Sequence, residues 1–468
     1  MAIKERFIDR HDELDYLKKE YQDSTFKFIS VIGRRRVGKT RLIEEFIENK
    51  KNAVYFFVQE LDDTELRLSF AEKLHRELKL NFLGTPSWEI IFEEILKASE
   101  NYRMVIILDE FQRFLSINKS VPSILQEYVD KYGKKSKLFL IVMGSSIGMM
   151  HKMFDHTSAL YGRRTGQLNI LPMQPFYLKE WFPGASLEEI IEIYSIFGGT
   201  PKYLEEADAR QPIIENIKNK ILSKRSILYN EPENLVKAEL PDSSTYFNIL
   251  KLISEGKNKP SEIAGFLTVK QTSLSYFLSV LENDMELIKR ETAVTEEKTR
   301  SKKAIYKMSD NFFRFWFRYV YPYKSDLEID NTGIVIEKIE RELNAFIGRS
   351  FEDVCRMAVL RLDLPFNPSK TGGWWGFYRD GGTRKEIEID IVALNESAKE
   401  ILFAECKWQD KVDAKRILAE LKEKARYVQW NNDDRKEHYA VFAKSFKEKF
   451  KEQGVMLFGL KDLEKAFK

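Results

Sequence analysis

One eight-residue segment near the amino terminus restricts the fold of this chain more than any other part of the sequence. Residues 33–40 read Gly-Arg-Arg-Arg-Val-Gly-Lys-Thr, which satisfies the pattern G-x-x-x-x-G-K-[ST] at every fixed position. An apolar run, 26–32, precedes the segment, and an amphipathic stretch, 41–49, follows it. A strand, a glycine-rich turn and a helix in this order present backbone N–H groups to phosphate oxygens. The segment therefore predicts a phosphate-binding loop in an α/β domain.

The residues of this loop have different expected tasks. We expect Gly33 and Gly38 to allow the tight backbone turn. Lys39 would reach the β- and γ-phosphates, and the Thr40 hydroxyl would hold Mg²⁺. ATP and Mg²⁺ are accordingly the expected cofactors. The remaining candidates for contact with the nucleotide are the intervening residues and the next residue of the helix, namely Arg34, Arg35, Arg36, Val37 and Arg41.

A second apolar strand ends in two carboxylates that would complete such a site. Residues 105–110 read Val-Ile-Ile-Leu-Asp-Glu. We expect Asp109 to belong to the Mg²⁺ shell and Glu110 to activate the attacking water. The next buried-strand candidate, 138–142, is followed by Gly-Ser-Ser, and the hydroxyl of Ser145 is a candidate sensor of the γ-phosphate. A simple turn is the alternative interpretation of that serine.

The amino-terminal motifs resemble the archaeal-type ATPase family, or DEXX-box ATPases, in the STAND/AAA+ division of P-loop NTPases. Residues 7–14 resemble the entry motif of that family, which packs near the adenine. This resemblance assigns Phe7 and Arg10 to the nucleotide site. Residues 198–201, Gly-Gly-Thr-Pro, resemble the lid motif, in which the proline, here Pro201, lies against the nucleotide. The resemblance covers residues 1–225 and, by domain order, extends to the rest of the chain.

An arginine pair resembles a further segment of the same family. Residues 161–166 read Tyr-Gly-Arg-Arg-Thr-Gly and follow the Gly-Ser-Ser strand. Arg163 or Arg164 would stabilise charge in the transition state, as arginine fingers do. A surface salt bridge is the alternative.

A second group of acidic residues lies near the carboxyl terminus. The stretch 386–392 alternates acidic and apolar residues, so Asp390 shares one strand face with two glutamates. Glu405 and Lys407 are two positions apart on the next strand candidate. Two carboxylates can bind Mg²⁺ beside a scissile phosphate, and a lysine can orient or deprotonate water. We therefore expect Asp390 and Glu405 to bind metal and Lys407 to assist catalysis.

This spacing resembles the PD-(D/E)xK restriction-endonuclease-like superfamily. In that superfamily a glutamate on the preceding helix often joins the metal site, and Glu352 occupies the matching place here. Ile389 stands where the superfamily usually has proline. Three interpretations are open: an intact metal site, a related fold without the chemistry, and a half-exposed sheet with charged edges.

The intervening region, 243–308, predicts three short helices and a β-wing, the order of a winged helix. Residues 287–303, where the wing is expected, contain six Lys or Arg and three Glu. Helix 271–283 is the expected recognition helix and contains no arginine. DNA is therefore an expected partner, with protein contacts alone as the alternative.

Length and composition set the outer limits. The 468 residues are 43% hydrophobic and 32% charged, enough to bury several cores. Two cysteines exclude a disulfide scaffold and a four-thiolate zinc module. No apolar run approaches the ~20 residues of a membrane span, and the charged amino terminus does not predict a secretory signal, so we expect a cytoplasmic protein without membrane contact. The net charge of +3 means that contact with nucleic acid must be local.

We therefore expect an α/β fold in four parts. These are a P-loop ATPase core with a parallel sheet (1–171), a helical lid (172–240), a winged helix (241–325) and a small α/β restriction-endonuclease-like domain (326–468). The predicted function is an ATP-hydrolysing switch coupled to DNA binding and to a metal-dependent nuclease-like domain. The alternatives are an ATP-regulated DNA- or protein-binding module with an inactive nuclease-like domain, and a motor-like AAA+ ring. The sequence allows an oligomer.

Overall fold

The computed structural model describes residues 7–240, 243–267, 270–297 and 304–467. The chain separates into two compact units. Unit 1 comprises Met1–Pro172 together with two short later segments, Thr200–Lys202 and Ser279–Glu286. Unit 2 comprises Met173–Gly199, Tyr203–Leu278 and Leu287–Lys468. The predicted division into four parts stays a prediction.

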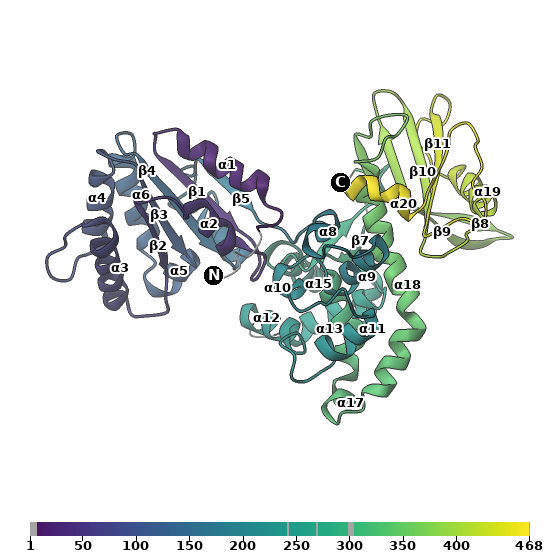
Figure 1. Cartoon of the computed structure of the whole chain (residues 1–468), viewed down its shortest axis with the longest axis horizontal. Coiled ribbons are helices and arrows are strands. Elements are labelled where there is room, and N and C mark those ends of the chain that lie inside the picture. The colour runs from purple at the N-terminus through teal and green to yellow at the C-terminus, as the bar shows by residue number, and fades with distance from the viewer. Residues whose placement is uncertain (1–6, 241–242, 268–269, 298–303, 468) are drawn as a thin grey trace. The chain divides into compact units, whose positions relative to one another are not determined.

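A parallel sheet forms the centre of unit 1 (Figure 1). In the described part of the chain it has five strands in the order β2-β3-β4-β1-β5, and every pairing is parallel. The carboxyl ends of parallel strands lie at one edge, so the loops that follow β1, β3 and β4 meet there. The strands are β1 (Lys27–Ile32), β2 (Ala53–Phe57), β3 (Met104–Asp109), β4 (Leu138–Gly144) and β5 (Gly166–Asn169).

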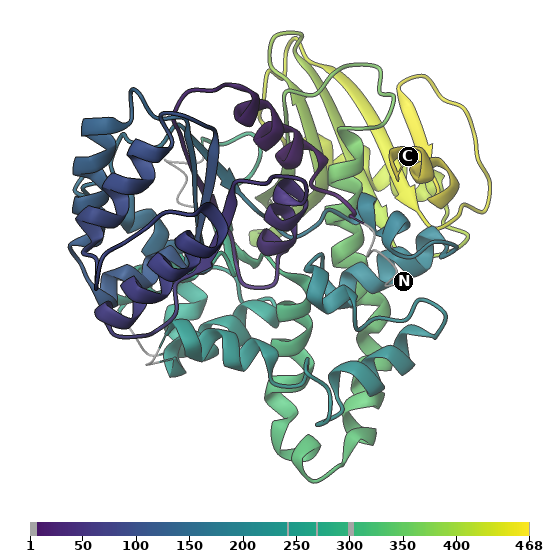
Figure 2. The same cartoon turned by 60° about the vertical axis from the view of Figure 1, so that its left-hand side comes forward.

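Helices cover both faces of this sheet (Figures 1 and 2). Alternate strand residues point to opposite faces, which gives two separate cores. Ile29 and Ile107 pack with the helices of one face, whereas Phe28 and Ile106 pack with those of the other. The first face carries α1 (His11–Gln22) and α2 (Lys39–Ile47), and the second carries α3 (Asp63–Leu78), α4 (Trp88–Ala98), α5 (Phe114–Ile117), α6 (Val121–Tyr132) and α7 (Ile147–Met153).

The sequence predicted the central strands of this sheet but not the edge strand β5. The runs at 26–32, 104–108 and 138–142 are strands because they are apolar and buried on both faces. Strand β5 has only four residues, Gly-Gln-Leu-Asn, and alternate residues are exposed. A short polar edge strand has no apolar run that would predict it from the sequence. Only its parallel pairing with β1 in the structure shows that these residues form a strand.

The first half of unit 2 is helical. Its long helix α9 (Leu187–Phe197) begins with a capping box, in which Ser186 and Glu189 bond each other's backbone N–H groups. The aromatic segment that begins with α16 (Asn311–Phe315) lies in the interior, and the indole N–H of Trp316, the next residue, donates to the carbonyl of Tyr229 at 2.8 Å. The shorter helices are α8 (Leu178–Trp181), α10 (Pro201–Leu204), α11 (Ile213–Asn216), α12 (Glu231–Glu239) and α17 (Lys324–Glu328).

Three helices and an antiparallel hairpin follow along the chain, which we call the α13–β7 segment. They are α13 (Ser244–Ser254), α14 (Pro260–Leu267), α15 (Gln271–Ser279), β6 (Ile288–Glu291) and β7 (Ile305–Met308). Part of the predicted basic wing, Lys298, Arg300, Lys302 and Lys303, lies outside the described residues.

The second half of unit 2 is a mixed sheet with the order β12-β11-β10-β9-β8 (Figure 1). The pairs β8–β9 and β9–β10 are antiparallel, whereas β10–β11 and β11–β12 are parallel. A helix, α19, makes the crossover that a parallel pair requires. The elements are α18 (Thr332–Val359), β8 (Lys370–Asp380), β9 (Thr383–Asn395), β10 (Glu400–Lys407), α19 (Ala414–Ala425), β11 (Lys436–Ala443), β12 (Val455–Phe458) and α20 (Leu460–Leu463).

The predicted fold class is confirmed: a parallel α/β sheet is followed by a separate α/β sheet in the C-terminal part. The stretch 386–392 and the strand candidate that carries Glu405 and Lys407 are present as β9 and β10. No helix in the described ranges is both long enough and apolar enough to cross a membrane.

The turn after α9 provides a test of packing. A Cβ atom at Gly199 would lie 1.9 Å from the backbone oxygen of Met173, and backbone cannot yield as a flexible side chain can. We expect Gly199→Ala to destabilise the protein by about 2 kcal/mol and to lower the midpoint of thermal unfolding by about 4 °C. Gly265→Ala, in α14, is the control, because nothing lies within 4 Å of its Cβ position. An unchanged midpoint for Gly199→Ala would contradict the packing described.

Candidate functional site

The loop between β1 and α2 has the backbone that its sequence predicts. Arg36 and Gly38 both have positive φ, +69° and +98°, which curves the loop back on itself. A Cβ at Gly33 would lie 2.4 Å from the backbone oxygen of Ile170, so only glycine allows this close approach. Val37 is buried in the core beside α1 and α2 and anchors the loop.

Lys39 lies inside the curve of this loop. Its side chain is buried, and its ammonium donates to the carbonyls of Gly33 at 2.7 Å and Arg34 at 2.8 Å. The positive charge is therefore held where the loop would receive a phosphate chain. Of the neighbouring arginines, Arg34 is buried, whereas Arg35 and Arg36 are exposed.

Asp109, at the carboxyl end of β3, is bound by a tyrosine that the sequence analysis missed. The Tyr55 hydroxyl on the adjacent strand β2 donates to Oδ2 of Asp109 and also forms a hydrogen bond with Thr40. Burial raises the pKa of Asp109, and the hydrogen bond from Tyr55 opposes that rise. Tyr55 thus joins the two residues expected to hold Mg²⁺. The available signal was a phenol within an otherwise apolar strand, since a buried hydroxyl needs a partner.

Glu110 and Ser145 lie together at the same edge of the sheet. Glu110 has a positive φ of 56°, and its carboxylate accepts hydrogen bonds from the Ser145 hydroxyl at 2.9 Å and from the Gln112 amide. Such backbone strain in a non-glycine residue is common at functional sites. Ser145, the candidate γ-phosphate sensor, is therefore hydrogen-bonded to Glu110, the candidate catalytic carboxylate.

The residues assigned by resemblance border the loop. The Arg10 guanidinium donates to the carbonyls of Val37 at 3.3 Å and of Leu171, and so supports the loop from outside. Arg41 pairs with Glu45 at 3.2 Å and lies 6.0 Å from the centre of the Phe7 ring. The Cγ atom of Pro201 is 3.7 Å from the position that a Cβ on Gly38 would take.

These residues fit a nucleoside triphosphate with Mg²⁺. A loop of this kind presents backbone N–H groups to phosphates, and the buried ammonium of Lys39 lies within it. The Thr40 hydroxyl follows in the first turn of α2, and the carboxylates of Asp109 and Glu110 lie at the end of β3. Thr40 and Asp109 are the side chains that would hold the metal.

The structure does not bring Arg163 or Arg164 to this loop in the same chain. Arg163 pairs with Asp130 at 3.1 Å, and the following residue, Thr165, bonds the carbonyl of Phe28, near the start of β1. The loop begins at the other end of that strand. Arg164 donates to the Ser30 hydroxyl at 3.1 Å, three residues before the loop, and its guanidinium lies 4.3 Å from the centre of the Phe154 ring. Arg163 therefore forms a salt bridge, as the alternative interpretation predicted. In this arrangement neither guanidinium reaches a nucleotide bound in the loop of the same chain.

A second site lies in the C-terminal sheet of unit 2. Asp390 on β9 accepts a hydrogen bond from the backbone N–H of Cys406 at 2.8 Å. Lys407 on β10 lies 2.7 Å from Oε2 of Glu405 and 3.9 Å from Oδ2 of Asp390. The antiparallel pairing of β9 and β10 thus brings together three side chains that the sequence analysis singled out.

Lys424, from α19, completes the surroundings of Glu405. Its ammonium donates to Oε1 of Glu405 at 2.6 Å, so each oxygen of this buried carboxylate has its own lysine. Burial alone would raise the pKa of Glu405, but the two lysines outweigh it and lower the pKa. Lys424 could not be assigned from the sequence, because the basic face of α19 resembles an ordinary solvated face.

Glu352 on α18 is close enough to Asp390 for the two charges to interact. Burial raises the pKa of Glu352, and the Asp390 carboxylate raises it further. Burial and the Glu405 carboxylate likewise raise the pKa of Asp390. The carboxylates therefore repel one another in a poorly solvated place, and a divalent cation would relieve that repulsion.

These carboxylates fit Mg²⁺ held together with a substrate. Among the described residues, no three His, Cys, Asp or Glu side chains are close enough to hold a metal by themselves. Mg²⁺ in enzymes is usually held by one or two carboxylates, with water and phosphate oxygens as the other ligands. Asp390 and Glu405 can supply two carboxylates, with Glu352 nearby.

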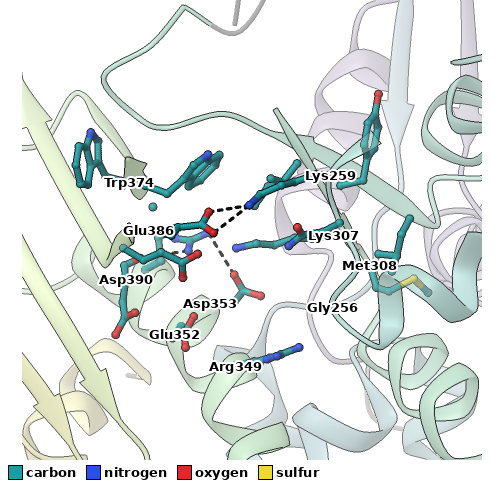
Figure 3. Close-up of a pocket in the computed structure, with 18 of the residues that line it drawn as sticks. Gly256, Lys259, Lys307, Met308, Arg349, Glu352, Asp353, Trp374, Glu386 and Asp390 are labelled. Atoms are coloured by element: carbon teal, nitrogen blue, oxygen red, sulfur yellow. Dashed lines mark hydrogen bonds and ion pairs between the residues drawn. The ribbon is translucent and has the colours of Figure 1, made fainter. Parts of the chain in front are cut away.

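Two residues of this site, Asp390 and Glu352, line a cavity of about 390 Å³ within unit 2 (Figure 3). The α13–β7 segment forms one wall, where Lys259 pairs with Glu386 of β9 at 2.9 Å. Trp374 and Trp375 on β8 also line the cavity while packing in the core of the sheet. The lining combines carboxylates with positive side chains. The carboxylates are Glu262, Glu352, Asp353, Glu386, Glu388 and Asp390, and the positive side chains are Lys259, Lys307, Arg314, Arg349 and Arg356.

Comparisons with known proteins agree with this description. Residues 7–207 match a family described as an ATPase domain predominantly from Archaea, and residues 316–417 match a family of archaeal and bacterial proteins of unknown function. The uncharacterized protein MJECL04 of Methanocaldococcus jannaschii is 36% identical over 465 residues, which is 97% of this chain and 99% of that protein. The Walker-type ATPase PABY2304 of Pyrococcus abyssi has a similar fold, with a TM-score of 0.50 and 21% identity, over 67% of this chain and 97% of that one.

The parallel sheet, the phosphate-binding loop and the family match define a P-loop ATPase domain of archaeal type, and they support ATP binding and hydrolysis. The chain as a whole belongs to the family of MJECL04, in which this ATPase domain precedes a C-terminal region of unknown function.

Tyr55 gives a direct test of the nucleotide site. Tyr55→Phe removes the hydroxyl that orients Asp109 and Thr40. We expect the Mg²⁺ concentration for half-maximal ATP hydrolysis to rise about tenfold, as when other partners of metal ligands are lost. Tyr132→Phe is the control, because its hydroxyl bonds Glu93 instead. Equal Mg²⁺ dependence for the two variants would show that Tyr55 does not support the site.

Proposed function

We propose that this protein is an ATP-dependent switch that controls a metal-dependent nuclease site in its C-terminal sheet. The observation that carries the proposal is the meeting of Asp390, Glu405 and Lys407 beside a cavity that is lined by Asp390 and by five positive side chains. Carboxylates that can bind Mg²⁺, surrounded by cations that attract phosphate, form a suitable site for phosphodiester hydrolysis.

In the ATPase domain each residue has a role that follows from its position. The loop N–H groups and Lys39 bind the phosphate chain, while Tyr55 fixes Thr40 and Asp109 at the metal position. Mg²⁺, when bound, neutralises charge on the β- and γ-phosphates. Glu110 orients the attacking water, and its hydrogen bond with Ser145 would respond to the γ-phosphate.

In the nuclease-like site the chain's residues would position a water molecule and a phosphate. Asp390 and Glu405 would hold Mg²⁺, which polarises the phosphate when bound. Lys407, between the two carboxylates, would orient the water. The water oxygen bonds to phosphorus, the bond from phosphorus to the leaving sugar oxygen breaks, and that oxygen receives a proton.

The α13–β7 segment supports the nucleic-acid part of the proposal. We interpret its helices and hairpin as a winged helix, a fold that places a helix in the DNA groove and a hairpin on the backbone. Its side chains also line the cavity that holds Asp390. DNA is therefore the expected partner.

Pro201 suggests how the nucleotide would affect the rest of the chain. It lies beside Gly38 of the loop, whereas the residues that flank Thr200–Lys202 belong to unit 2. A bound nucleotide that shifts Pro201 would pull on both connections, as γ-phosphate-dependent switches do.

One observation favours the alternative of an ATP-regulated binding module. Both oxygens of Glu405 are engaged by lysines, and a metal must compete with those ion pairs. If the ion pairs of Glu405 with Lys407 and Lys424 are more stable than its binding to a metal, the same cavity would bind nucleic acid without cutting it.

Removal of the loop lysine tests the ATPase. We expect Lys39→Ala to weaken ATP binding at least about tenfold, because a charge-assisted contact is lost, and to abolish phosphate release. Lys119→Ala, at an exposed position of unit 1, is the matched control. ATP affinity would be measured with a fluorescent ATP analogue. Normal hydrolysis by Lys39→Ala would overturn the assignment.

Substitution of Asp390 tests the nuclease. With Mg²⁺ or Mn²⁺ and a mixture of plasmid and single-stranded DNA, we expect Asp390→Asn to reduce cleavage by about a hundredfold or more. Glu396→Gln changes an exposed carboxylate in the turn that follows β9 and should cut like the wild type. Cleavage by none of these proteins, although they hydrolyse ATP, would favour the binding module.

A further inference from the structure

The cavity beside Asp390 is too small for double-stranded DNA. A sphere with its volume of about 390 Å³ would be about 9 Å across, whereas the major groove of B-DNA alone is about 12 Å wide. Pockets of this volume accommodate small-molecule ligands. One nucleotide of a flexible strand can therefore enter the cavity, whereas a duplex as a whole does not fit inside it.

The positive side chains of the cavity are not equivalent. Lys259 is paired with Glu386, Lys307 with Glu291, and Arg356 with both Glu291 and Asp353. Within the described ranges, neither Arg314 nor Arg349 has a carboxylate within ion-pair distance. These two guanidiniums remain available for an anion.

Arg314 and Arg349 lie near each other. Arg314 is held by the Phe346 carbonyl at 3.1 Å and the Ser350 hydroxyl at 2.6 Å, and its buried Nε atom has no partner. Burial lowers the pKa of Arg314 and the nearby Arg349 lowers it further, whereas the charges of Asp353 and Glu352 oppose this change. Two neighbouring guanidiniums that form no direct ion pair within the described ranges can bind a phosphate group.

These arginines lie on the same side of the cavity as the carboxylates of α18. Arg349, Glu352, Asp353 and Arg356 recur at helical spacing and form one face of that helix. Figure 3 shows Arg349 on this side and Trp374 across the cavity. Tryptophan side chains stack on bases of single strands irrespective of sequence.

We propose that the cavity takes a single-stranded nucleic acid, with Arg314 and Arg349 binding a backbone phosphate next to the one that lies at Asp390. The inference rests on the proposed nuclease function and defines its substrate: a single strand or an unpaired end, and not the interior of a duplex. DNA and RNA strands share this chemistry, so the test includes both.

Binding is measured without cleavage, using the full-length protein in EDTA. The probes are fluorescein-labelled oligothymidylate and oligouridylate of about 20 nucleotides and a blunt duplex of the same length. We expect Arg349→Ala to weaken binding of a single strand about fivefold and to reduce the slope of log affinity against log salt by about 0.7, the effect of one lost phosphate contact. Duplex binding should not change.

Arg341→Ala is the matched control, since Arg341 is an exposed arginine of the same helix that does not line the cavity. It should leave both quantities unchanged. Arg349 is itself exposed, so its substitution should leave folding intact. Equal effects of the two variants on single-strand binding would overturn the proposal.

Cleavage with Mn²⁺ separates this inference from the proposed function. Cutting of single strands and overhangs, but not of a blunt duplex, supports both. Cutting within the duplex would overturn the inference and leave the nuclease function standing. Arg349-dependent binding of single strands without any cleavage would support the cavity as a strand-binding site and refute the nuclease function.

Discussion

The crowding of three carboxylates, of which Glu405 is buried and Asp390 and Glu352 are half-buried, is the constraint on which the C-terminal part of this protein depends. Glu405 is only 3% exposed, and a buried carboxylate is tolerated only with compensating charge. Lys407 from the same strand and Lys424 from α19 supply that charge. Asp390 and Glu352 lack an equally close cation, so their repulsion is relieved by uptake of a proton or by a bound cation.

The same compensation connects neighbouring elements of unit 2. Arg356 of α18 pairs with Glu291 of the β6–β7 hairpin, and its guanidinium donates to the backbone carbonyl of Asp390 at 3.4 Å. The hairpin and the carboxylate site are therefore joined through one side chain. A change in the hairpin would therefore be transmitted through Arg356 to the strand that carries Asp390.

The ATPase site follows a different rule, because strand direction and not charge compensation assembles it. Three loops meet where β1, β3 and β4 end, and Tyr55 of β2 fixes the two residues expected to hold Mg²⁺. The buried strands were predictable because each is a continuous apolar run. The phosphate-binding loop was predictable because its glycines and lysine are needed for local reasons. Strand β5 and the contact of Tyr55 with Asp109 were not, since both depend on residues distant in the sequence.

The sequence by itself determined the class of fold, the phosphate-binding loop and the grouping of Asp390, Glu405 and Lys407, because spacing along single strands and across one hairpin is local information. The tertiary structure alone decided which cations serve those groups. It placed Arg163 with Asp130, Lys424 on Glu405, and Arg314 beside Arg349 in the cavity. Helical faces carry many charges in similar patterns, and only packing determines which of them meet a carboxylate and which remain available for a ligand.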